Sequence, residues 1–195
     1  MRIGILGGTF DPPHFGHLKL AQAAIEALHL DEVILLPASR NPFKQHTRAV
    51  PSEHRVAMCQ LLQKYEPKIA VSDMELTRGG VSYTVDTLGE LQMVHPGNYW
   101  FIMGADSLKG FKDWRNPERI LRLCRLAVAV RPPHDLEDVK LMVHEDYLPK
   151  IDFIPIEPTE ESSTEIREKL SRRHKITGLT PPEVVDYIRR HNLYS

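Results

Sequence analysis

GILGGTFDPPHFGH, residues 4–17, joins a short apolar run to a loop of glycines, prolines and two histidines. The apolar run, residues 2–6, predicts a buried strand that ends at Gly7 and Gly8. From Gly16 onward, apolar side chains recur at spacings of three and four residues, which predicts a helix. The stretch therefore predicts a strand, a glycine-rich corner and a helix in direct succession.

The alternation of strand and helix continues along the rest of the chain. Apolar runs typical of strands covered on both faces are found at residues 32–37, 68–73, 98–106, 125–130 and 151–156. Helices are expected from Ser52, from Thr84 as a cap, from Asn116 followed by Pro117, and over the C-terminal stretches SSTEIREKL and TPPEVVDYIRRH. In the last stretch, Thr180, Pro181 and Glu183 match a capping box. Residues 77–83 are expected to form a turn.

This pattern predicts an α/β fold with a doubly wound parallel sheet and helices on both of its faces. A small C-terminal helical portion is expected over about residues 157–195, within a single domain of residues 1–195. Ligands of such sheets lie outside the carboxyl ends of the strands, where the strand order reverses. The loop quoted above follows the first strand and is therefore a candidate binding site.

Composition limits the classes of function. The 195 residues are 42% hydrophobic and 26% charged, with a formal net charge of -1, which argues against a general nucleic-acid binder. Cys59 and Cys124 are expected to be buried thiols in helices, in a reducing compartment. No apolar run approaches the length of a membrane span, and the N-terminal run is short for a secretory signal, so we expect a cytoplasmic protein without a membrane partner.

The loop matches neither standard nucleotide-binding motif, because its glycines do not form G-x-G-x-x-G and no Walker A sequence is present. A zinc site on His14 and His17 lacks a convincing third ligand. The two histidines could also face solvent at a tight corner. Together, however, the residues predict a phosphate site: Gly8, Thr9 and Phe10 offer backbone at a strand end, and the imidazoles can donate hydrogen bonds at a helix N-terminus.

GGTFDPPHFGH resembles the N-terminal signature of the nucleotidyltransferase superfamily, which shares H-x-G-H with class I aminoacyl-tRNA synthetases. ESSTEIR, residues 161–167, is similar to the superfamily's second signature. Within it, GADSLKGFKDW, residues 104–114, and YTVDTL, residues 83–88, resemble the bacterial nicotinate-nucleotide adenylyltransferases. The resemblance covers essentially the whole chain and implies a Rossmann-like fold.

The resemblance implies transfer of the adenylyl group of ATP to nicotinate mononucleotide, giving nicotinate adenine dinucleotide and pyrophosphate in NAD biosynthesis. Attack by the mononucleotide's own phosphate needs no covalent enzyme intermediate. The expected catalytic residues are His14, His17 and Arg167. The residues expected to bind ATP, with Mg²⁺ as its counter-ion, are Gly8, Thr9, Phe10, His14, His17, Gly104, Asp106, Ser163, Thr164 and Arg167.

On the mononucleotide side, the resemblance implies contacts from Lys44, Thr84, Asp106 and Trp114, with the Trp114 ring stacked on the nicotinate ring. The N-terminus of the helix at Thr84 could receive the nicotinate carboxylate. The chain has NPFK where the family commonly has Pro-His-Lys, so a histidine role at Phe43 is in doubt.

Several alternatives stay open. A sister adenylyltransferase that prefers nicotinamide mononucleotide shares the same motifs. From a different class, a non-catalytic nucleotide-binding regulator would also keep the fold. The sequence leaves the oligomeric state open, although a sheet edge or an apolar helix face could support a homo-oligomer.

Overall fold

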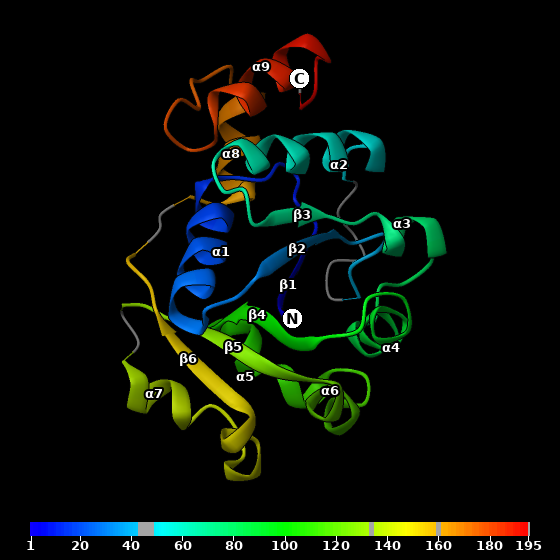
Figure 1. Ribbon diagram of the computed structural model, residues 1–195. Coiled ribbons are helices and arrows are strands. Elements are labelled where there is room, and N and C mark those ends of the chain that lie inside the picture. Colours follow the sequence, from blue (N-terminus) through cyan, green and yellow to red (C-terminus); the bar gives the residue numbers. More distant parts are fainter. Residues whose placement is uncertain (43–48, 133–134, 159–160, 195) are drawn as a thin grey trace.

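A six-stranded sheet forms the centre of the computed structural model, which describes residues 1–42, 49–132, 135–158 and 161–194 (Figure 1). Every strand pair is parallel, and the strand order is β3-β2-β1-β4-β5-β6. The strands are β1 Arg2–Gly8, β2 Glu32–Pro37, β3 Ile69–Val71, β4 Asn98–Gly104, β5 Cys124–Val130 and β6 Ile151–Pro155. The doubly wound α/β fold is confirmed.

Helices connect the strands and cover both faces of the sheet. The α-helices are α1 Phe15–Leu28, α2 Ser52–Leu61, α3 Met74–Arg78, α4 Thr84–Val94, α5 Ala105–Lys109, α6 Pro117–Leu123, α7 Leu136–Lys140, α8 Ser163–Ser171 and α9 Pro182–Arg190. Short 3-10 turns lie at Leu62–Lys64, Phe111–Asp113 and Glu145–Lys150. No helix in the described ranges has the length and apolar character that a membrane span requires.

Two apolar clusters lie on opposite faces of the sheet. One cluster joins the sheet to α1, α2, α8 and α9, and the other joins it to α4, α5, α6 and α7. Figure 1 shows α9 beside α2 on one side of the molecule and α4 and α6 on the other. In β1, Ile3 and Ile5 face one cluster and Leu6 the other, because alternate residues of a strand point to opposite faces.

The strand order reverses between β1 and β4. The chain runs from β1 outward through β2 to β3, then returns so that β4 pairs with the other side of β1. The carboxyl ends of these two strands, at Gly8 and Gly104, therefore flank the point where doubly wound sheets bind ligands.

Some local expectations were wrong. The strand expected over residues 98–106 ends at Gly104, and the expected turn overlaps α3. The first residue of α4 is Thr84, but the cap position is held by Tyr83 without a side-chain hydrogen bond. Cys59 and Cys124 are buried and free, as expected, but Cys124 begins a strand rather than lying in a helix.

The capping box expected at Thr180 was also wrong. The helix begins at Pro182, and Pro181 holds the cap position without a side-chain hydrogen bond. The Thr180 hydroxyl instead donates to the carbonyl of Pro13, 2.8 Å away, because the tertiary fold brings the two segments together. By contrast, Asn116 caps α6, and Pro117 is its first residue, as expected.

Candidate active site

The two histidines of the quoted loop lie at the start of α1. His14 is the extended residue that precedes the helix, and His17 lies in the first turn. The Nδ1 atom of His17 accepts a hydrogen bond from the backbone N–H of His14 at 3.2 Å. The two ring centroids are 3.8 Å apart, and the ring of Phe10 lies 4.8 Å from that of His17.

His14 is buried against Gly16. A side chain at Gly16 would place its Cβ 2.9 Å from Nδ1 of His14, so only glycine leaves room for the imidazole. Burial lowers the pKa of His14 to about 4, although the nearby Glu161 carboxylate opposes the shift. Because this pKa lies well below 7, His14 is neutral near pH 7 and carries a single N–H donor.

Helix α8 is fastened to the loop that precedes His14. The Ser163 hydroxyl donates to the Pro12 carbonyl at 2.8 Å, and Nη1 of Arg167 donates to the Asp11 carbonyl at 2.7 Å. Nη2 of Arg167 also donates to the hydroxyl of Thr164 at 3.3 Å. Ser163 and Arg167 of the ESSTEIR segment are therefore bonded to the loop that precedes His14, and Thr164 is bonded to Arg167.

The other side of the loop is held by α2 and by the end of the chain. Nη1 of the buried Arg55 donates to the carbonyls of Thr9 and Ala38, each at 2.8 Å. The Tyr194 hydroxyl donates to Oδ1 of the buried Asp11 at 2.7 Å. The loop is thus bound from several elements that are distant in sequence.

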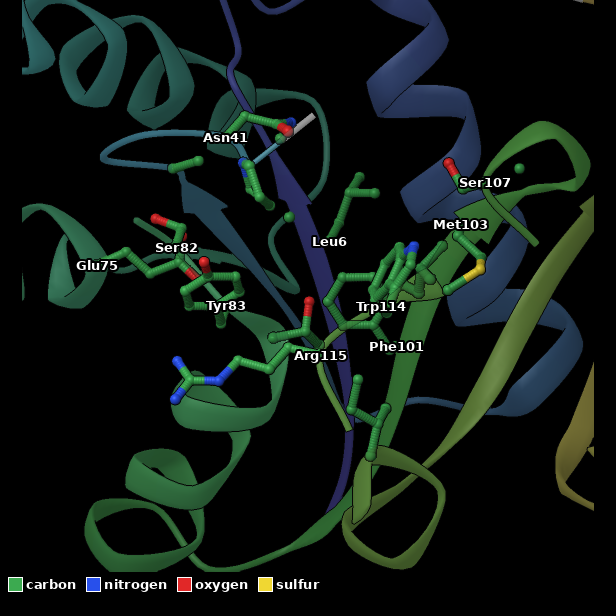
Figure 2. Close-up of a pocket in the computed structure, with 18 of the residues that line it drawn as sticks. Leu6, Asn41, Glu75, Ser82, Tyr83, Phe101, Met103, Ser107, Trp114 and Arg115 are labelled. Atoms are coloured by element: carbon green, nitrogen blue, oxygen red, sulfur yellow. The ribbon is translucent and has the colours of Figure 1, made fainter. Parts of the chain in front are cut away.

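A first cavity, of about 510 Å³, opens at the carboxyl ends of β1 and β4. Its wall includes aromatic side chains: the Trp114 ring meets the rings of Phe101 and Phe111 at centroid distances of 5.4 Å. Figure 2 shows Trp114 beside Phe101 on one side of this cavity and Tyr83 on the other. The first residue of α4, Thr84, also lines it. The cavity therefore offers a flat apolar surface and a helix N-terminus together.

A second cavity, of about 540 Å³, lies on the other side of His17. His14, Asp106 and Glu161 line it, and Asp106 belongs to α5, which follows β4 directly. The lining residues that the two cavities share are His17, Leu20 and Gly104. His17 therefore lies at the boundary between the two cavities.

The structure distributes the expected site residues over three places. The first cavity is lined by Gly8, His17, Thr84, Gly104 and Trp114, and the second by His14, His17, Gly104 and Asp106. The loop and its supports contain Thr9, Phe10, Ser163, Thr164 and Arg167. Lys44 lies outside the described residues.

Sequence reasoning missed residues that support or line the site. These are Arg55, Glu161, Thr180 and Tyr194. Glu161 lies at the edge of a recognised motif and could have been noticed there. Arg55 and Tyr194 are far from the motif they contact, and no local pattern marks them. Thr180 matches a capping pattern, which gives no sign of its bond to Pro13.

Comparison with known proteins agrees with this geometry. Residues 5–169 match the model of the cytidylyltransferase-like family. A curated nicotinate-nucleotide adenylyltransferase from Lachnoclostridium phytofermentans is 38% identical, over 99% of this chain and 98% of its own. One from Thermus thermophilus is 38% identical over the full length of both chains.

Solved structures show the same fold. A nicotinic acid mononucleotide adenylyltransferase from Plasmodium falciparum, complexed with NaAD, superimposes with a TM-score of 0.81 at 22% identity, covering 99% of this chain and 97% of its own. Together with the full-length curated relatives, the matched family model shows that the chain belongs to the cytidylyltransferase-like family and, within it, to the nicotinate-nucleotide adenylyltransferases.

Proposed function

We propose that this nicotinate-nucleotide adenylyltransferase transfers the adenylyl group of ATP where its two cavities meet. The observation that carries the proposal is the position of His17, which lines both cavities at the carboxyl ends of β1 and β4. The first cavity would take nicotinate mononucleotide, since Trp114 offers a flat face for the ring and the N-terminus of α4 can receive a carboxylate. The second cavity would take ATP.

The reaction needs no nucleophile from the protein. An oxygen of the mononucleotide's phosphate forms a bond to the α-phosphorus of ATP, the bond from that phosphorus to the bridging oxygen breaks, and pyrophosphate leaves with the electron pair. The protein's task is to align the two phosphates and to stabilise the charge that develops on the equatorial oxygens.

The histidines would supply the hydrogen-bond donors. Because Nδ1 of His17 accepts from the His14 backbone, the proton of a neutral His17 ring is carried by Nε2, which can donate to a phosphate oxygen. His14, kept neutral by burial, would donate to a neighbouring oxygen. Arg167 would act mainly by fixing the loop through the Asp11 carbonyl.

Magnesium would enter with ATP. We expect the ion to be bound largely by phosphate oxygens and water. Within the described residues, no group of three His, Cys, Asp or Glu side chains could hold a metal ion. Asp106 and Glu161 are the carboxylates along the second cavity and could add ligands directly or through water. When bound, the ion supplies charge neutralisation on the triphosphate.

Substitutions on the two sides of His17 test the assignment of the cavities. Trp114→Ala should raise the KM for nicotinate mononucleotide about tenfold or more, the scale of a lost base–aromatic stack, with the KM for ATP within about twofold because no ATP contact is removed. Trp114→Phe is the matched control and should keep most of the affinity, because it retains a flat ring. Asp106→Ala should raise mainly the KM for ATP. Pyrophosphate release with each substrate varied in turn measures both constants.

An equal effect of Trp114→Ala on both substrates would contradict this assignment. The same assay, run with nicotinate and nicotinamide mononucleotides, tests substrate choice. Faster turnover of the amide would overturn the proposed preference for the acid.

A further inference from the structure

The segment between α8 and α9 lies against the start of α1. Thr180 is 1% exposed, and its Oγ1 donates to the carbonyl of Pro13 at 2.8 Å. One residue earlier, the carbonyl of Leu179 accepts a hydrogen bond from the backbone N–H of Phe15 at 3.1 Å. These two bonds fix the peptide groups on either side of His14.

The Pro13–His14 peptide connects Thr180 to His17. The cis bond of the described chain is Asp11–Pro12, so the Pro13–His14 peptide is trans, and its C=O and N–H groups point in opposite directions. Thr180 fixes the carbonyl, and the N–H on the other side reaches Nδ1 of His17 at 3.2 Å. A donor on the carbonyl also polarises the peptide and makes its N–H a stronger donor.

We propose that Thr180 is a positioning residue for His17. By fixing the Pro13–His14 peptide, its hydroxyl keeps the proton of His17 on Nε2 and holds the ring in the orientation that donates to the reacting phosphate. The inference rests on the donor role proposed above for His17. It gives a function to a hydroxyl that does not cap the helix it precedes, since α9 has no side-chain cap bond.

Two substitutions separate the hydroxyl from the shape of the side chain. Thr180→Val removes the hydroxyl at nearly constant volume, whereas Thr180→Ser keeps it. Thr180→Val should lower kcat about tenfold, equivalent to about 1.4 kcal/mol in the barrier, with the KM of each substrate within about twofold. Thr180→Ser should restore most of kcat. Should Thr180→Val not fold, Thr180→Ala carries the same test.

The His17 ring provides a readout that a purely structural role would not change. Long-range ¹H–¹⁵N spectra, with the His17 signals assigned through His17→Gln, report which ring nitrogen carries the proton. We expect the Nε2–H form in the unmodified protein and an increased share of the Nδ1–H form in Thr180→Val. Ser163→Ala is the matched control for this spectrum. It removes an equivalent hydrogen bond, to the carbonyl of Pro12. The Pro12–Pro13 peptide has no N–H group, because Pro13 is a proline, so this bond cannot orient a donor toward His17.

A double-mutant cycle with His17→Ala distinguishes this inference from the proposed mechanism. If His17→Ala keeps normal turnover, the donor role itself is wrong. If His17→Ala lowers kcat by about 10² or more, Thr180→Val should then cause little additional loss in that background, because both changes act on the same group. Fully additive losses, or an unchanged His17 tautomer in Thr180→Val, would overturn the positioning role and leave the proposed function intact.

Discussion

His14 is 8% exposed and lines the second cavity, and its burial lowers the pKa of its imidazole to about 4 from an ordinary value of 6.5. The motif alone could not predict this charge state, because burial depends on how Gly16 lets the ring lie against the backbone. A neutral ring has one N–H donor and keeps its acceptor nitrogen. The site therefore uses a directed dipole at His14 rather than a full positive charge.

The lowered pKa predicts a dependence of stability on pH. Below pH 6.5 the unfolded chain takes up a proton at His14, whereas the folded chain takes it up only near pH 4, so the free energy of unfolding falls across this window. Between about pH 7 and about pH 5, protonation of His14 in the unfolded chain should lower the free energy of unfolding by about 2 kcal/mol. Urea unfolding at several pH values, for the unmodified protein and for His14→Asn, isolates the contribution of His14 to the pH dependence of stability. Asparagine is used because it is a good helix cap. Parallel pH profiles for the two proteins would contradict it.

Helix α8 begins with a side-chain cap at Ser162. The hydroxyl of Ser162 accepts a hydrogen bond from the backbone N–H of Glu165 at 3.1 Å, and the helix then presents Ser163 and Arg167 to the loop. Ser162→Ala should lower the free energy of unfolding by about 1 kcal/mol, and Ser162→Gly by a few tenths. Urea midpoints at constant m-value provide the measurement. Ser171→Ala, in the last turn of the same helix, is the control, and an equal loss there would show that the cap is not responsible.

At the scale of elements, the long apolar strands were predictable because sheet strands covered on both faces have nearly continuous apolar sequences. The five-residue helices α3, α5 and α7 were not, since one turn of helix leaves no periodic pattern to detect. The errors at Thr84 and Thr180 have a different cause. A threonine before an apolar run is compatible with capping, but tertiary contacts decide where its hydroxyl donates.

Across the whole molecule, the end of the chain is tied to its beginning. The Tyr194 hydroxyl donates to Oδ1 of Asp11, which also accepts a hydrogen bond from the backbone N–H of Val50 at 3.3 Å. Burial and the bond to Asp11 raise the pKa of Tyr194, so the phenol remains a donor throughout the neutral range. Asp11 belongs to the histidine motif, but Tyr194 lies outside both motifs, and sequence patterning has no means of pairing residues at such separations.

Removing this hydroxyl should weaken the whole structure. Tyr194→Phe should lower the free energy of unfolding by about 2 kcal/mol, because a hydrogen bond to a buried carboxylate is lost. Tyr187→Phe provides the comparison, since the Tyr187 hydroxyl pairs with Nδ1 of His54 in a less buried place. Its removal should lower the free energy of unfolding by less. Chemical denaturation of the three proteins measures the difference. Equal stability of Tyr194→Phe and the unmodified protein would show that the link contributes nothing.

The contacts to the loop also set an order of events during synthesis. Ser163, Arg167, Thr180 and Tyr194 bind groups that lie 151 to 183 residues earlier in the chain. A ribosome makes the histidine motif well before it makes these four partners. A nascent chain thus carries both histidines long before it can hold them in place, and adenylyl transfer has to wait until the final helix has emerged.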